Sequence, residues 1–401
     1  MSTVQIDPGV REEVKTVIET AHRFAEEVLR PVGAELDKLT DPADVIAPGS
    51  PLWPVFDRYR ELGLTDMASP ELGLSPAEQA YLQSAVGEEM GWGDSGLAIS
   101  LAVSQFHRIF AMLSGNPALI EQFAGPDSKE IGCWAITEPD HGSDSLAFTE
   151  GHFNDANVRA NCVATPDGDS YVIRGQKSAW VSNGTIATIA TVFCTIDPDV
   201  GFQAGGVCIV PLDLPGVSKG APLDKIGQRA LNQGEIFFDD VRVPAEYMVV
   251  GKDAYSFVVE MVLAIANSNM ASTFTGVARA SFEHALDYSR ERIQGGKPII
   301  QHQNVRSRLF RMFTQTEAAR SLARRTASMG TAGAPPVQYS IASKVFCTTT
   351  AFEVASAAVQ TYGGNGLSRE YPVEKLLRDA RASMIEDGCN DVLSLVGAAK
   401  L

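Results

Sequence analysis

The sequence predicts an α+β protein built from three successive parts: a helical part, a β part and a second helical part. Apolar residues recur at three- and four-residue steps in the first and last thirds of the chain, which is typical of amphipathic helices. Between about residues 158 and 243, short β-branched runs alternate with Gly, Asp and Pro, which is typical of strands and turns. A chain of 401 residues is long enough for two or three domains. We expect a helical domain over 1–130, a β-domain over 131–245 and a helical bundle over 246–401.

The N-terminal helix is predicted from a run of apolar residues at helical spacing, and Pro31 is expected to end it. The residues are Val10, Val14, Val17, Ala21, Phe24 and Val28. The stretch DPADVIAPGSP that follows reads as a loop, and helical texture returns from about Pro76 to Leu113.

The β part contains runs such as YVIRGQK, IATVFCTI and EIFFDDVRV, separated by turn residues. After Pro244 the helical pattern resumes and continues to the end of the chain. The Phe274–Arg292 segment carries one apolar face, and a second face runs from Ile341 to Val359. The stretch GTAGAPP before Val337 is expected to separate two long helices.

Composition excludes several classes of protein. A formal net charge of -16 argues against a nucleic-acid partner, and any anionic ligand needs a local basic cluster. We see no secretory signal and no apolar stretch approaching the roughly 20 residues of a membrane span. The six cysteines form no CxxC pair and the six histidines no HExxH, so we expect reduced thiols and no metal site. These features predict a cytoplasmic globular protein with no membrane association.

Two segments of the β part carry groups suited to a planar cofactor. In CWAITEPDHGSDS, a tight turn offers backbone N–H groups and hydroxyls that can bond the polar edge of a ring; the alternative is a turn without a ligand. In GQKSAWVSNG, Trp180 and Ser182 are expected on the same side of a strand. One can stack on an isoalloxazine and the other can hydrogen-bond it, although a Trp on a strand is often a core residue.

Two segments of the last third are candidates for anion binding and for catalysis. In RERIQGGKPIIQHQNV, Arg292 closes a helix and lies beside a Gln-Gly turn, which suits a pyrophosphate; a simple helix C-cap is the alternative. In VQTYGGNGLSREYPVEKLLRDARASMIEDGCNDV, Gly363 and Gly364 permit close backbone approach. A predicted amphipathic helix then ends by presenting Asp387 before Gly388.

Taken together and in this order, the segments resemble the acyl-CoA dehydrogenase family over nearly the whole chain. The matching features are TEPDHGSD, the Lys-Trp-Asn-Gly hairpin, IFFDDVRVP, ERIQGGKPIIQHQ and QTYGGNG…YPVEKLLRDAR. The resemblance implies a central β-barrel or sandwich-like domain, a C-terminal four-helix bundle, FAD as cofactor and a homotetramer. It also implies α,β-dehydrogenation of an acyl-CoA thioester held between the flavin and a carboxylate, with an electron-transfer flavoprotein as electron acceptor.

The resemblance also implies site residues. Those nearest the flavin ring would be Trp134, Ile136 and Thr137, with Thr137 bonding the polar edge of the ring. The full set of implied cofactor positions is Trp134, Ile136, Thr137, Gly142, Ser143, Trp180, Ser182, Arg292, Gln294, Gln360, Gly363 and Gly364. Ser143, Asp387 and Gly388 would contact substrate. The last five cofactor positions hold the pyrophosphate and adenosine across a subunit interface in the family, so a monomer is expected to bind FAD poorly.

The sequence departs from the family at the catalytic base. The family's usual Glu-Gly-Thr step is Asp387-Gly388-Cys389 here. We expect Asp387 to be the base, since Glu386 would point about 100° away in a helical turn. Related enzymes with a base on an earlier helix would place it at Ile265 or Ala266, neither of which can accept a proton.

Three other departures accompany this change. The Arg that often follows the earlier base position is Asn267 here. The Lys-to-Trp spacing in the hairpin is one residue longer than usual, which bears on the role of Ser182. The Asp side chain is one bond, roughly 1.5 Å, shorter than Glu, and a shift of about 1 Å can cost roughly 100-fold in rate. The substrate must therefore sit differently, or the reaction differs.

Alternative functions remain open at this point. An Asp base also occurs in relatives acting on cyclic acyl-CoA thioesters and in nitroalkane oxidase, a flavin oxidase of the same fold. The position of a supporting Arg in that oxidase is Ser394 here. A monooxygenase, a dehydrogenase of carrier-protein thioesters and a non-catalytic flavin-binding or DNA-associated relative are the other hypotheses. The acidic balance of the chain argues against the last.

Overall fold

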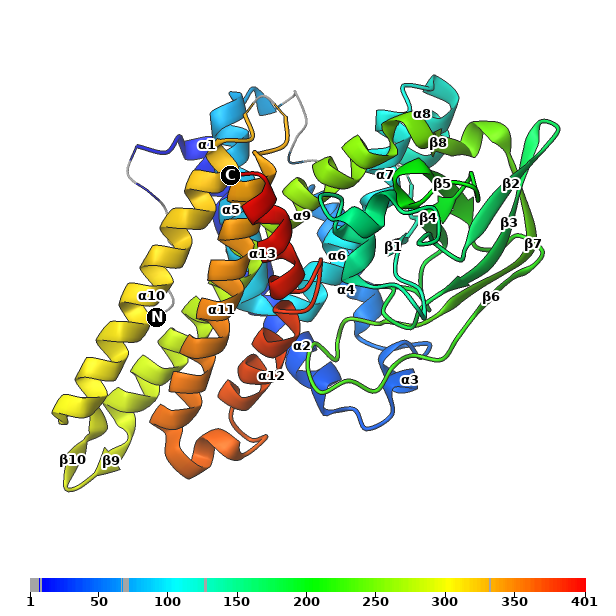
Figure 1. Cartoon of the computed structure of the whole chain (residues 1–401). Coiled ribbons are helices and arrows are strands. Elements are labelled where there is room, and N and C mark those ends of the chain that lie inside the picture. Colours follow the sequence, from blue (N-terminus) through cyan, green and yellow to red (C-terminus); the bar gives the residue numbers. More distant parts are fainter. Residues whose placement is uncertain (1–6, 8, 66, 68–71, 126–127, 332) are drawn as a thin grey trace.

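The computed structural model describes the chain except for residues 1–6, 8, 66, 68–71, 126–127 and 332. In order along the chain, it has helices, then a β-sheet with short connecting helices, then long helices (Figure 1). The predicted α+β class and its order of parts are confirmed.

The N-terminal helix runs further than the sequence pattern predicted. α1 (Glu12–Phe24) continues through a π-helical turn (Ala25–Leu29) into α2 (Arg30–Lys38), so Pro31 does not end it. The N–H of Arg30 bonds the Ala25 carbonyl five residues back, and Pro31, which has no N–H, begins the next turn. The wider π turn accommodates the proline, because a missing donor is tolerated in a first helical turn.

The remaining N-terminal helices correct a second expectation, because the supposed loop before residue 52 contains a short helix. Asp41 caps it through a side-chain bond to the Ala43 N–H. The bounds are α3 Pro42–Val45, α4 Leu52–Glu61, α5 Pro76–Gly93, α6 Ser95–Val103, α7 Phe106–Leu113 and α8 Pro117–Ala124.

The middle part is one mixed sheet of eight strands, in the order β6-β7-β3-β2-β4-β5-β8, with β1 paired to β4. Most pairs are antiparallel, but β1 and β2 both run parallel to β4 and follow one another along it. The bounds are β1 Gly132–Ala135, β2 Val163–Asp167, β3 Ser170–Lys177, β4 Ile189–Thr195, β5 Gly205–Pro211, β6 Val217–Lys219, β7 Ile236–Pro244 and β8 Met248–Val250. The predicted central β part is therefore present.

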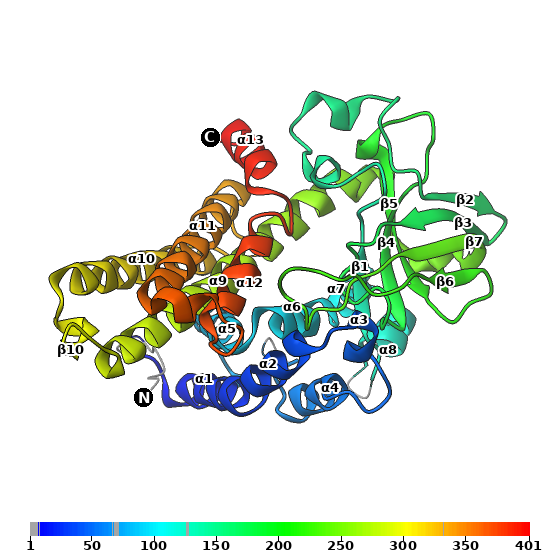
Figure 2. The same ribbon diagram turned by 90° about the horizontal axis from the view of Figure 1, so that it is seen from below.

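The C-terminal part is a bundle in which α9 and α11 pack against each other and each packs against α10 and α12, and α9 also packs on α5. Their bounds are α9 Lys252–Glu291, α10 Gln303–Ser328, α11 Val337–Tyr362, α12 Val373–Ser383 and α13 Asn390–Ala399. A hairpin of β9 (Ile293–Gln294) and β10 (Lys297–Pro298) turns the chain between α9 and α10. This hairpin lies at the end of the bundle away from the sheet (Figures 1 and 2).

Two helical stretches are longer and more apolar than the sequence reading allowed. Among the described residues, Ser95–Leu113 and Lys252–Glu291 meet a length and composition test for a membrane span. Half and two thirds of their apolar windows, respectively, are buried inside the molecule. Such burial fits core helices of a soluble protein.

Candidate functional site

Asp387 lies in a sharp reversal between α12 and α13. Its φ is 51° and that of Gly388 is 92°, so two successive residues occupy the left-handed region. For an Asp this conformation costs on the order of 1–2 kcal/mol, whereas Gly adopts it freely. The reversal ends α12 before the residue that the sequence predicted as the base. The surrounding structure must therefore hold the loop in place.

Three hydrogen bonds hold this reversal, one within it and two from distant elements. The Cys389 N–H donates to the Ser143 hydroxyl (2.9 Å), and the Asn390 N–H donates to the Met384 carbonyl (3.0 Å). The Lys344 ammonium, on α11, donates to the Gly388 carbonyl (2.7 Å). The first bond brings the predicted Ser143 next to the loop of the predicted base.

Sequence reasoning missed Lys344. It lies on the face of α11 that also carries buried Ile341, and it is itself fully buried. A lysine on an otherwise apolar helical face was the available signal, because a buried ammonium needs partners. Its second partner is the Asn390 side-chain oxygen, at 2.9 Å.

The two neighbouring carboxylates differ in proton affinity. Burial raises the pKa of Asp387 to about 6, while the Lys344 charge opposes the rise. Burial and the Asp387 charge raise the pKa of Glu386 to about 8. Both residues keep some solvent exposure in the single chain, so they are removed from water only in part. The order of the two pKa values favours Asp387 over Glu386 as the ionised group, and a carboxylate with a raised pKa is a stronger base than a free one.

The turn that carries Thr137 is held by a buried ion pair between the next residue, Glu138, and Lys177. The ammonium of Lys177 donates to Glu138 Oε1 at 2.6 Å, and neither side chain is exposed. Glu138 also accepts the N–H groups of Asn161 and Cys162. The Thr137 hydroxyl accepts a bond from the Ser178 hydroxyl at 3.0 Å. Glu138 therefore has a structural function, and Thr137 is held at a fixed place beside the segment that leads to Trp180.

Trp180 and Ser182 do not lie on a strand, contrary to the prediction. β3 ends at Lys177, and the segment from 178 to 187 consists of turns with a single β-bridge, between Ser182 and Gln233. The two residues nevertheless flank buried Val181, and Trp180 is 60% exposed. The Gln233 amide donates to both the Trp180 carbonyl and the Ser182 hydroxyl, at 3.2 and 3.3 Å. Gln233, also missed from the sequence, thus orders an exposed aromatic face and a hydroxyl.

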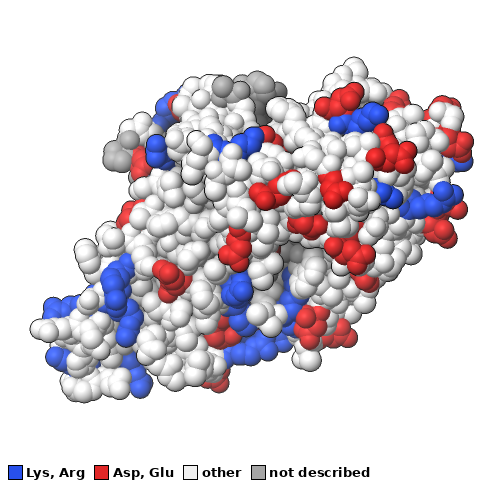
Figure 3. Space-filling view, viewed as in Figure 1, with Lys and Arg blue, Asp and Glu red and all other residues white. Residues whose placement is uncertain are grey.

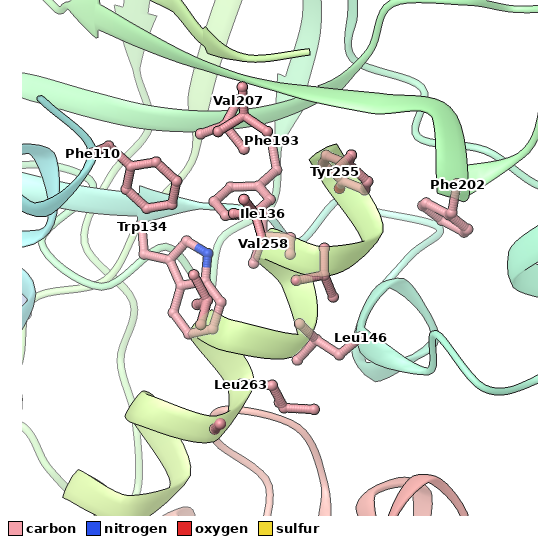
Figure 4. Packing of buried hydrophobic residues seen from close by; sticks show 14 of the residues in the cluster. Phe110, Trp134, Ile136, Leu146, Phe193, Phe202, Val207, Tyr255, Val258 and Leu263 are labelled. Carbon is pink, nitrogen blue, oxygen red and sulfur yellow. The ribbon is translucent and has the colours of Figure 1, made fainter. Parts of the chain in front are cut away.

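Trp134 and Ile136 contribute mainly to the core. They are 9% and 7% exposed and belong to a cluster that includes Phe110, Phe193 and Leu263 (Figure 4). The Trp134 ring stacks on Phe106 with centroids 5.2 Å apart. Gly142, in contrast, has open space around it. The sequence did not reveal how deeply these two residues are buried. An apolar residue on a strand has the same sequence pattern whether its side chain packs in the core or faces a ligand.

The remaining predicted positions form a separate group. A pocket of about 690 Å³ brings together Arg292, Gln294, Gln360, Gly363 and Gly364. Gly363 has a φ of 62°, and space is open around both glycines. Arg308 also lines this pocket and was missed from the sequence, where it is one of several arginines in a polar helix. Figure 3 shows Lys and Arg side chains gathered at this end of the molecule, which supplies the local positive charge that an anionic ligand needs.

The two groups of predicted residues do not meet within one chain. The Arg292–Gln294 turn is at the β9–β10 end of the bundle, away from the sheet (Figures 1 and 2). The α12–α13 loop that carries Asp387 is instead bonded to Ser143, in the turn region after β1.

Comparison with known proteins identifies the family. The family models described as acyl-CoA dehydrogenase, C-terminal domain, and acyl-CoA dehydrogenase, middle domain, match residues 258–401 and 133–241. Cyclohex-1-ene-1-carbonyl-CoA dehydrogenase of Syntrophus aciditrophicus (strain SB) is 31% identical, over 97% of this chain and 90% of the relative. The chain belongs to the acyl-CoA dehydrogenase family. Its relatives are named as acyl-CoA dehydrogenases, and this protein is an oxidoreductase of that class.

Solved structures of relatives share the whole architecture. Butyryl-CoA dehydrogenase from Megasphaera elsdenii matches with a TM-score of 0.84 and 28% identity, over 98% of this chain and 99% of that one. A chain from a study of the electron transferring flavoprotein of Acidaminococcus fermentans matches with a TM-score of 0.85 and 25% identity, over 98% of both chains. The acyl-CoA dehydrogenase fold therefore covers essentially the full length of the protein.

Proposed function

We propose that the protein catalyses FAD-dependent α,β-dehydrogenation of an acyl-CoA thioester, with Asp387 as the base that removes the α-proton. The observation that carries this proposal is the loop of Asp387, which is tied through Cys389 to Ser143 in the turn after Thr137. The base and the groups suited to a flavin edge are thus parts of one hydrogen-bonded unit. Bound FAD would accept the β-hydrogen as hydride. The protein would bind and orient the thioester and remove its α-proton.

The proton affinities of the loop support Asp387 over Glu386. A base must be unprotonated at working pH, and the pKa values of about 6 and about 8 leave Asp387 ionised and Glu386 protonated near neutrality. A thioester α-proton is too weakly acidic for a carboxylate alone, so the carbonyl oxygen must be stabilised as the proton leaves.

The residues present suit FAD in two places. Arg292 and Arg308, with the exposed backbone of Gly363 and Gly364, fit a pyrophosphate. The exposed face of Trp180 fits an aromatic ring. Since these groups are at different ends of one chain, we propose that each cofactor is held by two subunits of a homotetramer.

A compact acyl group, cyclic or short, is the substrate class that we propose. The relative from Syntrophus is named for a cyclohexene carbonyl thioester and the one from Megasphaera for butyryl-CoA. The likeness to a chain studied with an electron transferring flavoprotein supports a protein of that type as the electron acceptor.

Anaerobic bleaching of the flavin absorbance tests the proposal. Purified protein is mixed with straight, branched and cyclic acyl-CoAs, alongside Asp387→Asn, Glu386→Gln and, as a matched control, Asp391→Asn on exposed α13. We expect one thioester class to bleach the wild type, Glu386→Gln and Asp391→Asn proteins but not Asp387→Asn. Bleaching by nitroalkanes instead, with rapid reoxidation in air, would favour an oxidase; loss of bleaching only in Glu386→Gln would identify the neighbouring carboxylate as the base.

A further inference from the structure

A buried ammonium, that of Lys344, contacts the loop that carries Asp387. The side chain is fully buried in the bundle, on α11. Burying a charge is costly unless it is hydrogen-bonded and paired, so the position of this lysine requires an explanation. Its contacts all lead to one place, the reversal that follows α12.

The ammonium donates two hydrogen bonds to the reversal. It donates to the Gly388 carbonyl at 2.7 Å and to Asn390 Oδ1 at 2.9 Å. The Asn390 amide in turn donates to the Thr348 hydroxyl, one turn further along α11, at 3.1 Å. The next peptide N–H, that of Cys389, is held by Ser143. Both polar groups of the peptide link between Gly388 and Cys389 are therefore fixed, the carbonyl by the bundle and the N–H by the β part.

We propose that Lys344 is a positioning residue for the catalytic loop, where its ammonium fixes the Gly388 peptide and so holds Asp387 in the left-handed conformation needed for proton abstraction. The inference rests on the function proposed above. A misplacement of about 1 Å costs roughly 100-fold in rate, so a loop with two left-handed residues needs such an anchor.

The charge of Lys344 also acts on the base. The titratable groups that act on Lys344 are Asp387, Glu386 and the Cys389 thiol, which favour its charged form, while burial lowers its pKa to about 8. Lys344 is the charged group that lowers the pKa of Asp387 against burial. Lys225, the other lysine near the loop, acts on Glu386, and bonds Leu231 and Gln233.

Three variants separate these roles in the flavin-loaded protein. Lys344→Met removes both the charge and the anchor. Asn390→Ala removes one anchoring bond and keeps the charge. Lys225→Met is the matched control, because it removes a neighbouring ammonium that acts on Glu386 and not on Asp387. For each we would measure flavin content, melting temperature and the rate of anaerobic flavin reduction as a function of pH. The titration midpoint of Asp387 would be followed by the infrared band of its protonated carboxyl, identified as the band that is lost when Asp387→Asn is introduced.

We expect Lys344→Met to keep its flavin, to reduce it about 100-fold more slowly and to raise the titration midpoint of Asp387 by roughly one pH unit or more. Asn390→Ala should be slower by about tenfold with an unchanged midpoint. Lys225→Met should leave the Asp387 midpoint in place.

The proposal is overturned if Lys344→Met has the wild-type rate and midpoint, or only a lower melting temperature. Should Lys344→Met fail to fold, a wild-type rate in Asn390→Ala overturns it. If no thioester reduces the wild-type flavin, the proposed function fails separately, and the infrared midpoints of wild type and Lys344→Met still decide the role of the lysine.

Discussion

The hydroxyl of Ser143 accepts a 2.9 Å hydrogen bond from the backbone amide of Cys389, 246 residues further along the chain. This contact joins the turn that follows β1 to the loop between α12 and α13. Any shift between the sheet and the bundle must therefore move the candidate base, and the bond gives the two parts a common reference point.

Replacing Ser143 with Ala leaves the part-buried Cys389 N–H without this acceptor, which costs about 0.5–1.5 kcal/mol and frees the loop to shift. We expect the rate of flavin reduction by substrate to fall at least tenfold. Stopped-flow absorbance measures the rate. Ser394→Ala is the control, since that exposed hydroxyl donates to the Asn390 carbonyl of its own helix. Equal rates in the two variants would contradict the prediction.

The raised pKa of Asp387 predicts opposite effects of pH on activity and stability. Activity should rise with pH through about 6 as the carboxyl ionises. The folded state binds this proton more tightly than the unfolded chain, so the carboxyl favours folding below pH about 4 and loses that contribution as pH rises through about 6.

Asp387→Asn should accordingly be more stable than wild type at pH 7, by about 1–3 kcal/mol, and no more stable at pH 4. Urea unfolding at the two pH values measures the difference. A variant that is less stable at pH 7 would argue that the ionised carboxylate is well stabilised in the folded chain.

Gly388 is required by geometry as well as by its neighbours. Its φ is 92°, and a Cβ there would lie 2.8 Å from a Leu393 methyl carbon. Gly388→Ala should destabilise the protein by about 1–3 kcal/mol and slow flavin reduction. Gly251→Ala is the comparison, since that glycine has an ordinary φ of -92° and open space for a Cβ. Thermal unfolding of both variants tests the prediction, and equal melting temperatures would refute it.

The pocket at the bundle end predicts a cofactor phenotype. Arg292→Ala should weaken FAD binding by at least tenfold through the loss of a charge-assisted bond, without changing the pH midpoint of Asp387. Arg290→Ala, two residues earlier, removes an exposed ion pair with Asp287 and should retain its flavin. Flavin release on dilution or gel filtration measures both, and similar retention would exclude Arg292 from the site.

The order of helical and β parts could be predicted because periodicity is a local property of the sequence. The turn at Arg292 and Gln294 could be predicted for the same reason, since its glycines encode it. The prediction that Pro31 ends the helix was wrong because a π turn accommodates the proline, and the local sequence pattern does not predict a π turn.

Lys344 was missed because its partner, Gly388, is 44 residues away. The domain boundaries after residues 130 and 245, and the individual cofactor contacts, stay predictions.

The separation of Thr137 and Trp180 from the pocket of Arg292 has a genetic consequence. If each cofactor spans two subunits, a chain damaged at Trp180 and a chain damaged at Arg292 are both inactive alone, yet a mixed assembly contains some sites made from two undamaged halves. Co-expression of an inactive Trp180 variant with an inactive Arg292 variant would then restore part of the activity. Two alleles damaged in the same half would restore none, so the pattern of rescue would map which residues share a site.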